Sequence, residues 1–241
     1  MVARYREALS GRPLDVGCGA GRILGYLVEL GGEVEGLDIS EELVAHCRVA
    51  YPRARVRVGD LADVGAAVQG RFTAVLAMDN VLDVFDDPQR RRALGELREL
   101  LEPDGLLIFS SHNLGYADAR RGGRGDAARS LDRARELLSK AGSRSVGEVV
   151  AVAVRMPARI RNRRRMAPLQ RREGDHAIIN DEAHDYGLLH YYIGRDDQAR
   201  QLSDLGYELI ECLDVDGRVV QAGGRSLAPW LHYIARPAVA N

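Results

Sequence analysis

Short apolar runs alternate with longer amphipathic stretches over the first half of the chain. The apolar runs predict strands at residues 13–17, 33–38, 55–59, 72–78 and 105–111, and the amphipathic stretches predict helices at 22–30, 41–50 and 87–101. Alternating strands and helices are typical of an α/β fold with a doubly wound, mostly parallel sheet. The sequence Pro103-Asp104-Gly105 predicts a turn between the third helix and the fifth strand.

The pattern changes after residue 113. We expect helices at 126–141 and around the arginines of 155–165, a strand at 188–193, a helix at 196–205, and strands at 207–215 and 230–235. The simplest organisation is one seven-stranded sheet: residues 1–113 form its first part, and 191–241 complete it. Residues 114–190 would be a helical insertion after strand five. Insertions of this size exceed ordinary loop lengths and commonly carry substrate contacts.

Composition excludes several classes of protein. The 34 basic and 35 acidic side chains nearly cancel, so the chain has no general attraction for polyanions. Lys140 is the only lysine, an arginine bias that we interpret as the codon usage of a GC-rich bacterial genome. The three cysteines lack metal-ligand spacing, and no apolar run approaches the roughly 20 residues of a membrane span. We therefore expect a cytoplasmic protein without a membrane segment or a metal.

The most informative segment runs from Leu14 to Arg22 and contains glycines at positions 17, 19 and 21. Glycines allow a sharp turn and a close approach of the backbone to a ligand. A dinucleotide site would need a small residue where Arg22 stands, and Asp15 would repel a diphosphate but attract an ammonium group. These two residues argue against a nicotinamide-dependent dehydrogenase. A glycine-rich turn that binds nothing is the alternative.

Acidic residues also follow the next three predicted strands. Asp38 could accept hydrogen bonds from both hydroxyls of a ribose. Asp60 could accept from an exocyclic amine while Leu61 packs on a purine, and Asp79-Asn80 follows the fourth strand, where open α/β sheets bind ligands. Each acid alone would be an ordinary solvated loop residue. Together with Asp15 they indicate a nucleoside site.

On these residues the sequence resembles the class I S-adenosylmethionine-dependent methyltransferases. The resemblance rests on the glycine-rich residues 14–21, the acidic motifs 36–40 and 59–61, and the turn at 100–105. It implies S-adenosylmethionine as cofactor and an antiparallel last strand. The implied cofactor contacts are Asp15, Gly17, Cys18, Gly19, Gly21, Asp38, Ile39, Asp60, Leu61, Asp79 and Asn80. Only about 11 residues precede the first strand, fewer than is common in the family, so either the start is unusual or the insertion serves as the lid.

The methyl acceptor would lie over the ends of strands four and five and meet the insertion. His112 follows strand five, and residues 180–192 concentrate polar and aromatic side chains. We predict His112, His184 and Tyr191 as catalytic, and Asn113, Tyr186, His190 and Tyr192 as substrate-binding. Histidines can act as bases, and tyrosines can surround an amine or hydrogen-bond a phenol. The alternative is that these residues are half-buried strand positions and loop caps.

Eight arginines and no acid lie between Arg155 and Arg172. They could contact RNA phosphates, but no aromatic residues interleave with them for base stacking, so we favour a solvated helical face. The preferred hypothesis is methyl transfer to nitrogen or oxygen of a small molecule or modified peptide, by a monomer or homodimer that binds no nucleic acid. The alternatives are an RNA methyltransferase and a non-catalytic nucleoside-binding module.

Overall fold

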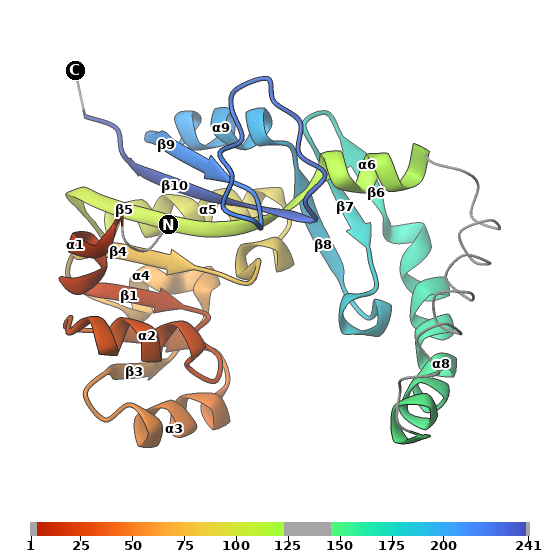
Figure 1. Ribbon diagram of the computed structural model, residues 1–241, viewed down its shortest axis with the longest axis horizontal. Helices are drawn as coiled ribbons and strands as arrows, with labels where there is room; N and C mark the ends of the chain where they lie inside the picture. The colour runs from red at the N-terminus through yellow and green to blue at the C-terminus, as the bar shows by residue number, and fades with distance from the viewer. Residues whose placement is uncertain (1–3, 123–145, 240–241) are drawn as a thin grey trace.

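A computed structural model describes residues 4–122 and 146–239 of the 241-residue chain (Figure 1). Its centre is a sheet in which five neighbouring strands run parallel in the order β3-β2-β1-β4-β5. These strands are β1 (Pro13–Val16), β2 (Glu35–Asp38), β3 (Arg55–Val58), β4 (Phe72–Ala77) and β5 (Leu101–Asn113). The five strands predicted from the apolar runs are therefore confirmed, and they form the expected doubly wound arrangement.

Helices cover both faces of this sheet, because alternate residues of each strand point to opposite sides. On one face, α1 (Arg6–Ser10), α2 (Arg22–Leu30) and α3 (Glu41–Ala50) share an apolar cluster with Ala74 and Leu76 of β4. On the other face, α4 (Val64–Ala67), α5 (Asp87–Glu99) and α9 (Arg195–Asp204) pack on Val75 and Ala77. Two short 3-10 helices, η1 (Leu61–Asp63) and η2 (Val81–Val84), follow β3 and β4.

Two strands from the end of the chain complete the sheet beyond β5. Strand β10 (Trp230–Pro237) pairs antiparallel with both β5 and β9 (Tyr207–Leu213). The predicted antiparallel orientation of the last strand is confirmed. The strand order β3-β2-β1-β4-β5-β10-β9 gives a Rossmann-like core of mostly parallel strands.

The insertion extends the sheet as well as adding helices. Its helices are α6 (Leu114–Gly122), α8 (Val146–Met166), η3 (Ala167–Leu169) and η4 (Ala183–Tyr186), and its strands are β6 (Arg171–Glu173), β7 (His176–Asn180) and β8 (Leu189–Ile193). Strand β8 runs parallel beside the last two residues of β5, and β7 and β6 follow as an antiparallel pair. Figure 1 shows this second part of the sheet standing beside the core with α8 at its outer side. The expectation of a purely helical insertion was incomplete, and the helix predicted at 126–141 lies outside the described residues.

The predicted turn at Pro103-Asp104-Gly105 lies near the start of β5 rather than before the strand. Helix α5 ends at Glu99 and β5 begins at Leu101, so Pro103-Asp104-Gly105 lies inside the strand. The pairing partners of β5 change there from Leu101 opposite Phe72 to Leu106 opposite Ala74, which makes the three residues a bulge. Within the described part of the chain, no helix combines the length and apolar character needed to cross a membrane.

Candidate functional site

The turn after β1 adopts a backbone that only glycine accepts readily. Gly17, Gly19 and Gly21 all have positive φ angles, of 69°, 52° and 87°. A Cβ atom on Gly17 would lie 2.5 Å from the Val81 side chain, whereas one on Gly19 would meet no atom within 4 Å. The turn thus packs against η2 on one side and presents bare backbone to open space on the other, as a ligand-binding turn requires.

Asp15 lies beneath this turn and is only 2% exposed. Burial raises the pKa of its carboxyl to about 7; the backbone N–H of Leu24 opposes this rise, while Asp79 and Asp38 add to it. Its Oδ2 atom is buried and has no hydrogen-bond partner among the described residues. A buried carboxylate oxygen without a partner is costly, so a cationic group beside it would be favoured.

Asp38 joins the second strand to the glycine turn. Its Oδ2 accepts a hydrogen bond from the backbone N–H of Gly19 at 2.7 Å, and its Oδ1 accepts from the backbone N–H of Ser40 at 2.9 Å. Each carboxylate oxygen can accept a further bond, so a hydroxyl pair can still approach this residue. Next to it, Ile39 is 70% exposed and offers an apolar surface at the rim.

The acidic motif at residues 59–61 has one exposed and one buried side chain. Asp60 is exposed and caps η1 by accepting from the backbone N–H of Ala62 at 2.8 Å. Leu61 is buried in the core cluster beside α4 and α5, and Cys18 is buried on the other face. Asp60 is therefore the member of this motif that faces solvent.

The loop after β4 connects the glycine turn to the end of β5. Asp79 and Asn80 both have positive φ angles, of 57° and 59°, a conformation that asparagine and aspartate tolerate best after glycine. Asp79 pairs with Arg22 at 2.5 Å on the surface. The side-chain Nδ2 of Asn80 lies 3.4 Å from Nε2 of His112, while its backbone N–H donates to the Ser110 hydroxyl at 2.8 Å.

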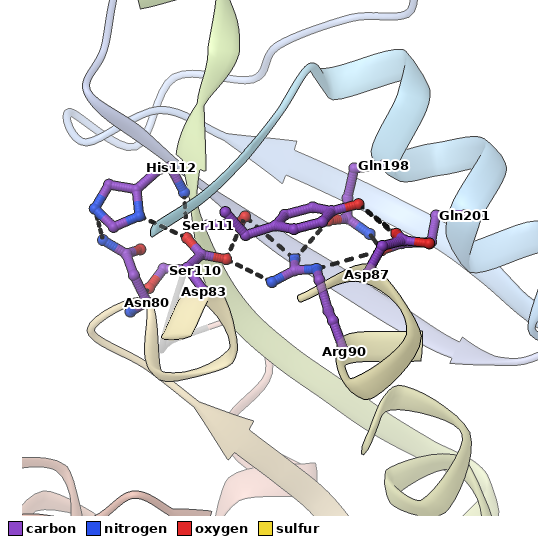
Figure 2. A network of polar contacts seen from close by, with 10 residues as sticks. Asn80, Asp83, Asp87, Arg90, Ser110, Ser111, His112, Gln198 and Gln201 are labelled. Atoms are coloured by element: carbon purple, nitrogen blue, oxygen red, sulfur yellow. Dashed lines mark hydrogen bonds and ion pairs between the residues drawn. The ribbon is translucent and has the colours of Figure 1, made fainter. Parts of the chain in front are cut away.

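His112 is held from below by a buried carboxylate. Asp83 of η2 accepts from the backbone N–H of His112 at 2.6 Å, and its Oδ2 lies 2.7 Å from Nδ1 of the ring. Figure 2 shows Asp83 between His112 on one side and Arg90 on the other. Asp83 and Arg90 are both fully buried and form an ion pair at 2.5 Å. This arrangement leaves Nε2 as the ring nitrogen that faces Asn80.

Side chains from the insertion surround the same imidazole. Because Tyr192 is the register partner of His112, the two rings stack with centroids 4.7 Å apart. The Tyr192 hydroxyl donates to Asp181 Oδ2 at 2.7 Å, and the same oxygen lies 3.1 Å from Nδ1 of His190 and 3.9 Å from Nε2 of His112. Burial raises the pKa of Tyr192 well above its usual value, so its hydroxyl stays protonated.

Two predicted residues at this edge lie apart from the cluster. Tyr191 points to the opposite side of β8, where its hydroxyl donates to Asp87 at 2.7 Å and its ring lies 4.6 Å from the Arg90 guanidinium. The Asn113 amide donates to the carbonyl oxygens of Ser226 and Ala228, which ties the end of β5 to the loop that precedes β10. Its side-chain oxygen accepts from the backbone N–H of Gly115. Both residues are buried, and the structure gives each of them contacts that support the fold.

The remaining predicted residues, His184 and Tyr186, belong to η4 between β7 and β8. His184 is exposed, and its ring centroid is 5.7 Å from that of His190. Tyr186 is half-buried, and the guanidinium groups of Arg159 and Arg163 lie over its ring at 5.3 and 5.7 Å. His184, Asp185 and Tyr186 have three successive positive φ angles, an uncommon conformation for residues other than glycine. The rings of His112, His190 and Tyr192 thus form the inner part of the cluster, and His184 its outer edge.

Part of the arginine-rich stretch is neutralised by acids. Arg159 lies 3.5 Å from Asp185 and 3.9 Å from Glu182, Arg171 pairs with Glu173, and Arg172 pairs with Asp118. These pairs involve three of the eight arginines, whereas Arg161 and Arg163–Arg165 are exposed.

The sequence did not single out Asp83, Arg90 or the glutamines of α9 that bond to Arg90. Asp83 is the second acid after β4, a weak signal, and Arg90 occupies an inward position of an otherwise ordinary amphipathic helix. Their contacts join residues 7 to 111 positions apart. A pairing over such distances becomes visible only when the strands and helices are assembled.

Residues 14–105 match the family described as "Methyltransferase domain". Over 116 residues, the chain is 34% identical to the ubiquinone biosynthesis O-methyltransferase of Xanthomonas axonopodis pv. citri (strain 306), covering 46% of this chain and 47% of that protein. Over 108 residues, it is 29% identical to dTDP-3-amino-3,4,6-trideoxy-alpha-D-glucopyranose N,N-dimethyltransferase of Streptomyces venezuelae, covering 44% and 45%. The matches thus span about half the length of these curated relatives.

The likeness in structure covers nearly the whole chain. The crystal structure of an S-adenosylmethionine-dependent methyltransferase from Clostridium acetobutylicum ATCC 824 superposes with a TM-score of 0.61 and 10% identity, over 98% of this chain and 89% of that one. Residues 14–105 therefore match a methyltransferase-domain family, and the chain has the fold of the class I S-adenosylmethionine-dependent methyltransferases.

Proposed function

We propose that the protein transfers a methyl group from S-adenosylmethionine to a nitrogen or oxygen of a small molecule or a modified peptide. The single observation that carries the proposal is the position of His112. Its Nε2 lies 3.4 Å from Asn80, whose neighbour Val81 packs against Gly17 of the glycine turn. These two contacts support a base on the same side of the sheet as the turn on which the cofactor would rest.

The residues around the turn fit this cofactor in chemistry. The unpartnered Oδ2 of Asp15 would receive its ammonium group, and the open side of Gly19 would allow it to approach the backbone. Asp38 would accept from the ribose hydroxyls, and Asp60 from the adenine amine, with Ile39 at the rim. When bound, the sulfonium supplies a methyl group that is already activated toward a nucleophile.

The chain itself would align the acceptor and take its proton. Methyl transfer depends mainly on positioning and on exclusion of water, and a base is needed only for an acceptor that arrives protonated. His112 is the base in this proposal, with His190, Tyr192 and Tyr186 as acceptor contacts and His184 at the entrance. Tyr191 and Asn113 are left out, because the Tyr191 hydroxyl points to Asp87 on the opposite side of β8 and the Asn113 amide bonds the loop before β10.

The relatives support a small acceptor. Their names describe methylation of oxygen in ubiquinone biosynthesis and of nitrogen on an amino sugar nucleotide. An RNA acceptor is disfavoured by the acids that pair with Arg159 and Arg172. Binding of bulk tRNA that weakens steeply with salt would reverse this choice.

Calorimetry with S-adenosylhomocysteine tests the proposal. We expect the wild type to bind, and Asp38→Ala to bind at least about tenfold more weakly, since hydrogen bonds to a charged group contribute about 1.5–3 kcal/mol each. Asp104→Ala is the matched control, because Asp104 is an exposed aspartate in the bulge at the opposite end of β5. No binding by the wild type at millimolar ligand, or equal binding by Asp38→Ala, would reject the cofactor assignment.

A further inference from the structure

Asp83 is a buried carboxylate that contacts three donors and one ring nitrogen of His112. Its Oδ1 accepts from Arg90 Nη1 at 2.5 Å and from the Ser111 hydroxyl at 2.8 Å. Its Oδ2 accepts from the backbone N–H of His112 at 2.6 Å and lies 2.7 Å from the ring Nδ1. Arg90, the Ser111 hydroxyl and the His112 backbone are donors whatever the tautomer of the ring, and a carboxylate surrounded by donors favours a hydrogen on Nδ1 as its fourth.

The contacts at the two ring nitrogens of His112 both favour the tautomer with its hydrogen on Nδ1. A hydrogen on Nδ1 satisfies Asp83, and the Asn80 amide nitrogen, at 3.4 Å, offers a donor to Nε2. In the neutral ring, Nε2 is then the unprotonated nitrogen and carries the lone pair. That nitrogen is the one on the side of the acceptor site.

Arg90 fixes Asp83 in turn. Its Nη2 donates to Gln198 at 2.7 Å and to Ser111 at 3.2 Å, and its Nε donates to Gln201 at 3.4 Å. Figure 2 shows this chain of contacts leading from Asp83 through Arg90 to the two glutamines of α9. Because the guanidinium is bonded on several sides and fully buried, neither it nor Asp83 can turn away without leaving a buried charge unpaired.

We propose that Asp83 is a positioning residue, which holds His112 with Nδ1 protonated and Nε2 free to accept a proton, and that Arg90 holds Asp83 in place. This inference rests on the proposed function. The other groups that face His112 are Asn80 from the β4 loop, Asp181 ahead of η4, and His190 and Tyr192 from β8. Among them, only Asp83 has an oxygen within 3 Å of a ring nitrogen of His112 in the described structure.

In this proposal His112 receives the proton that the acceptor loses. The acceptor's O–H or N–H bond would break and its proton would pass to Nε2 of His112. The acceptor's lone pair would form the bond to the methyl carbon, and the electron pair of the broken carbon–sulfur bond would stay on sulfur. The imidazole becomes an imidazolium whose Nδ1–H still faces the Asp83 carboxylate. A carboxylate in this position stabilises the imidazolium and keeps the ring in the productive orientation without itself becoming protonated.

Replacing Asp83 with asparagine should reverse the tautomer. The amide NH₂ must face either the Arg90 guanidinium or the His112 side, where the backbone N–H of His112 is also a donor. The clash with the guanidinium is the more costly of the two, because the guanidinium is charged and fully buried. We therefore expect the introduced amide to turn its NH₂ toward Nδ1, which makes Nδ1 the acceptor and moves the ring hydrogen to Nε2. The same change at Asp87 is the matched control, because Asp87 belongs to the far end of the network, with Tyr191 and Gln201, and does not contact His112.

Nitrogen-15 NMR of the imidazoles tests the inference directly. The His112 signals are assigned by their loss in His112→Gln, and spectra are recorded at about pH 9, where imidazoles are neutral. We expect the Nδ1–H form in the wild type and in Asp87→Asn, and the Nε2–H form in Asp83→Asn. An Nε2–H form in the wild type, or an unchanged Nδ1–H form in a folded Asp83→Asn, would overturn the inference.

The wild-type spectrum keeps the test valid even if Asp83→Asn does not fold. Calorimetry with S-adenosylhomocysteine on the same samples separates this inference from the proposed function. Binding by the wild type together with the wrong tautomer would reject the role of Asp83 alone. The expected tautomer without binding would reject the cofactor assignment and leave the positioning of His112 intact.

Discussion

The two sides of the site are built in different ways. On the side of the glycine turn, Asp38 and Asp60 bind backbone N–H groups, two of them only two residues further along the chain. On the side of His112, Asp83 binds side chains from α5 and β5, and Arg90 binds side chains from α9. The first side is organised by local backbone geometry, and the second by buried charges brought from distant segments.

Each side also contains an arginine–aspartate pair, and the two pairs have the same distance of 2.5 Å. The side chains of Arg22 and Asp79 are 71% and 73% exposed, whereas those of Arg90 and Asp83 are 0% exposed. Water screens the first pair and does not reach the second. The two pairs should therefore differ in what they contribute to stability and in what happens when one partner is removed.

The largest effect should come from Arg90→Met. The substitution leaves Asp83 buried without its cationic partner, which typically costs about 3–5 kcal/mol of unfolding free energy. Urea denaturation followed by circular dichroism measures the difference from wild type. Arg92→Met is the matched control on the same helix, because Arg92 is exposed and pairs at the surface with Asp63 and Glu96.

We expect the control to unfold close to the wild type. Equal stabilities of Arg90→Met and Arg92→Met would contradict the buried network. Such a result would also mean that the buried Arg90–Asp83 pair does not hold the His112 side of the site in place.

The sequence could predict the glycine-turn side almost completely. The glycines at 17, 19 and 21 predicted the turn, and the predicted helices at 22–30 and 41–50 coincide with α2 and α3. This success has a physical reason, since caps, turns and strand ends depend on neighbours within a few residues. The contacts of these residues with a cofactor stay a prediction.

The His112 side could be predicted only in part. The polar aromatic cluster was visible in the sequence, but strand alternation places Tyr191 on the opposite side from His190 and Tyr192, next to Arg90 and Asp87. Strands β6 and β7 were missed because they are short and pair only within the insertion. Asp83 and Arg90 were missed because, apart from each other, their partners lie 21 to 111 positions away in the chain.

A second prediction concerns Asp15 on the glycine-turn side. Its pKa is raised from 3.8 to about 7 because burial disfavours the carboxylate. In the free protein the carboxyl is mostly protonated below that value, while the ammonium of the ligand requires it ionised. Affinity for S-adenosylhomocysteine should therefore rise by about tenfold between about pH 6 and pH 8, as the ionised fraction grows.

Calorimetry over this pH range measures the rise. Asp15→Asn is the control, because it keeps the shape of the side chain and cannot ionise; its affinity should be lower and nearly independent of pH. The stability of the free protein should change with pH in the opposite direction to the affinity. Since the folded state holds the proton more tightly than the unfolded state, the free protein loses stability as pH rises from about 4 to about 7, and Asp15→Asn should not. A flat affinity profile in the wild type would mean that Asp15 does not meet a cation.

The smallest effect should come from Arg22→Gln, which removes the exposed counterpart of Arg90. Screened surface pairs contribute about 0–1 kcal/mol, so the unfolding free energy should change by less than about 1 kcal/mol. Arg22 also lowers the pKa of Asp15 slightly through its charge, so its loss should move the midpoint of the affinity profile to higher pH. A large loss of stability, similar to that of Arg90→Met, would show that the exposed and buried pairs are energetically alike and that burial does not distinguish the two sides.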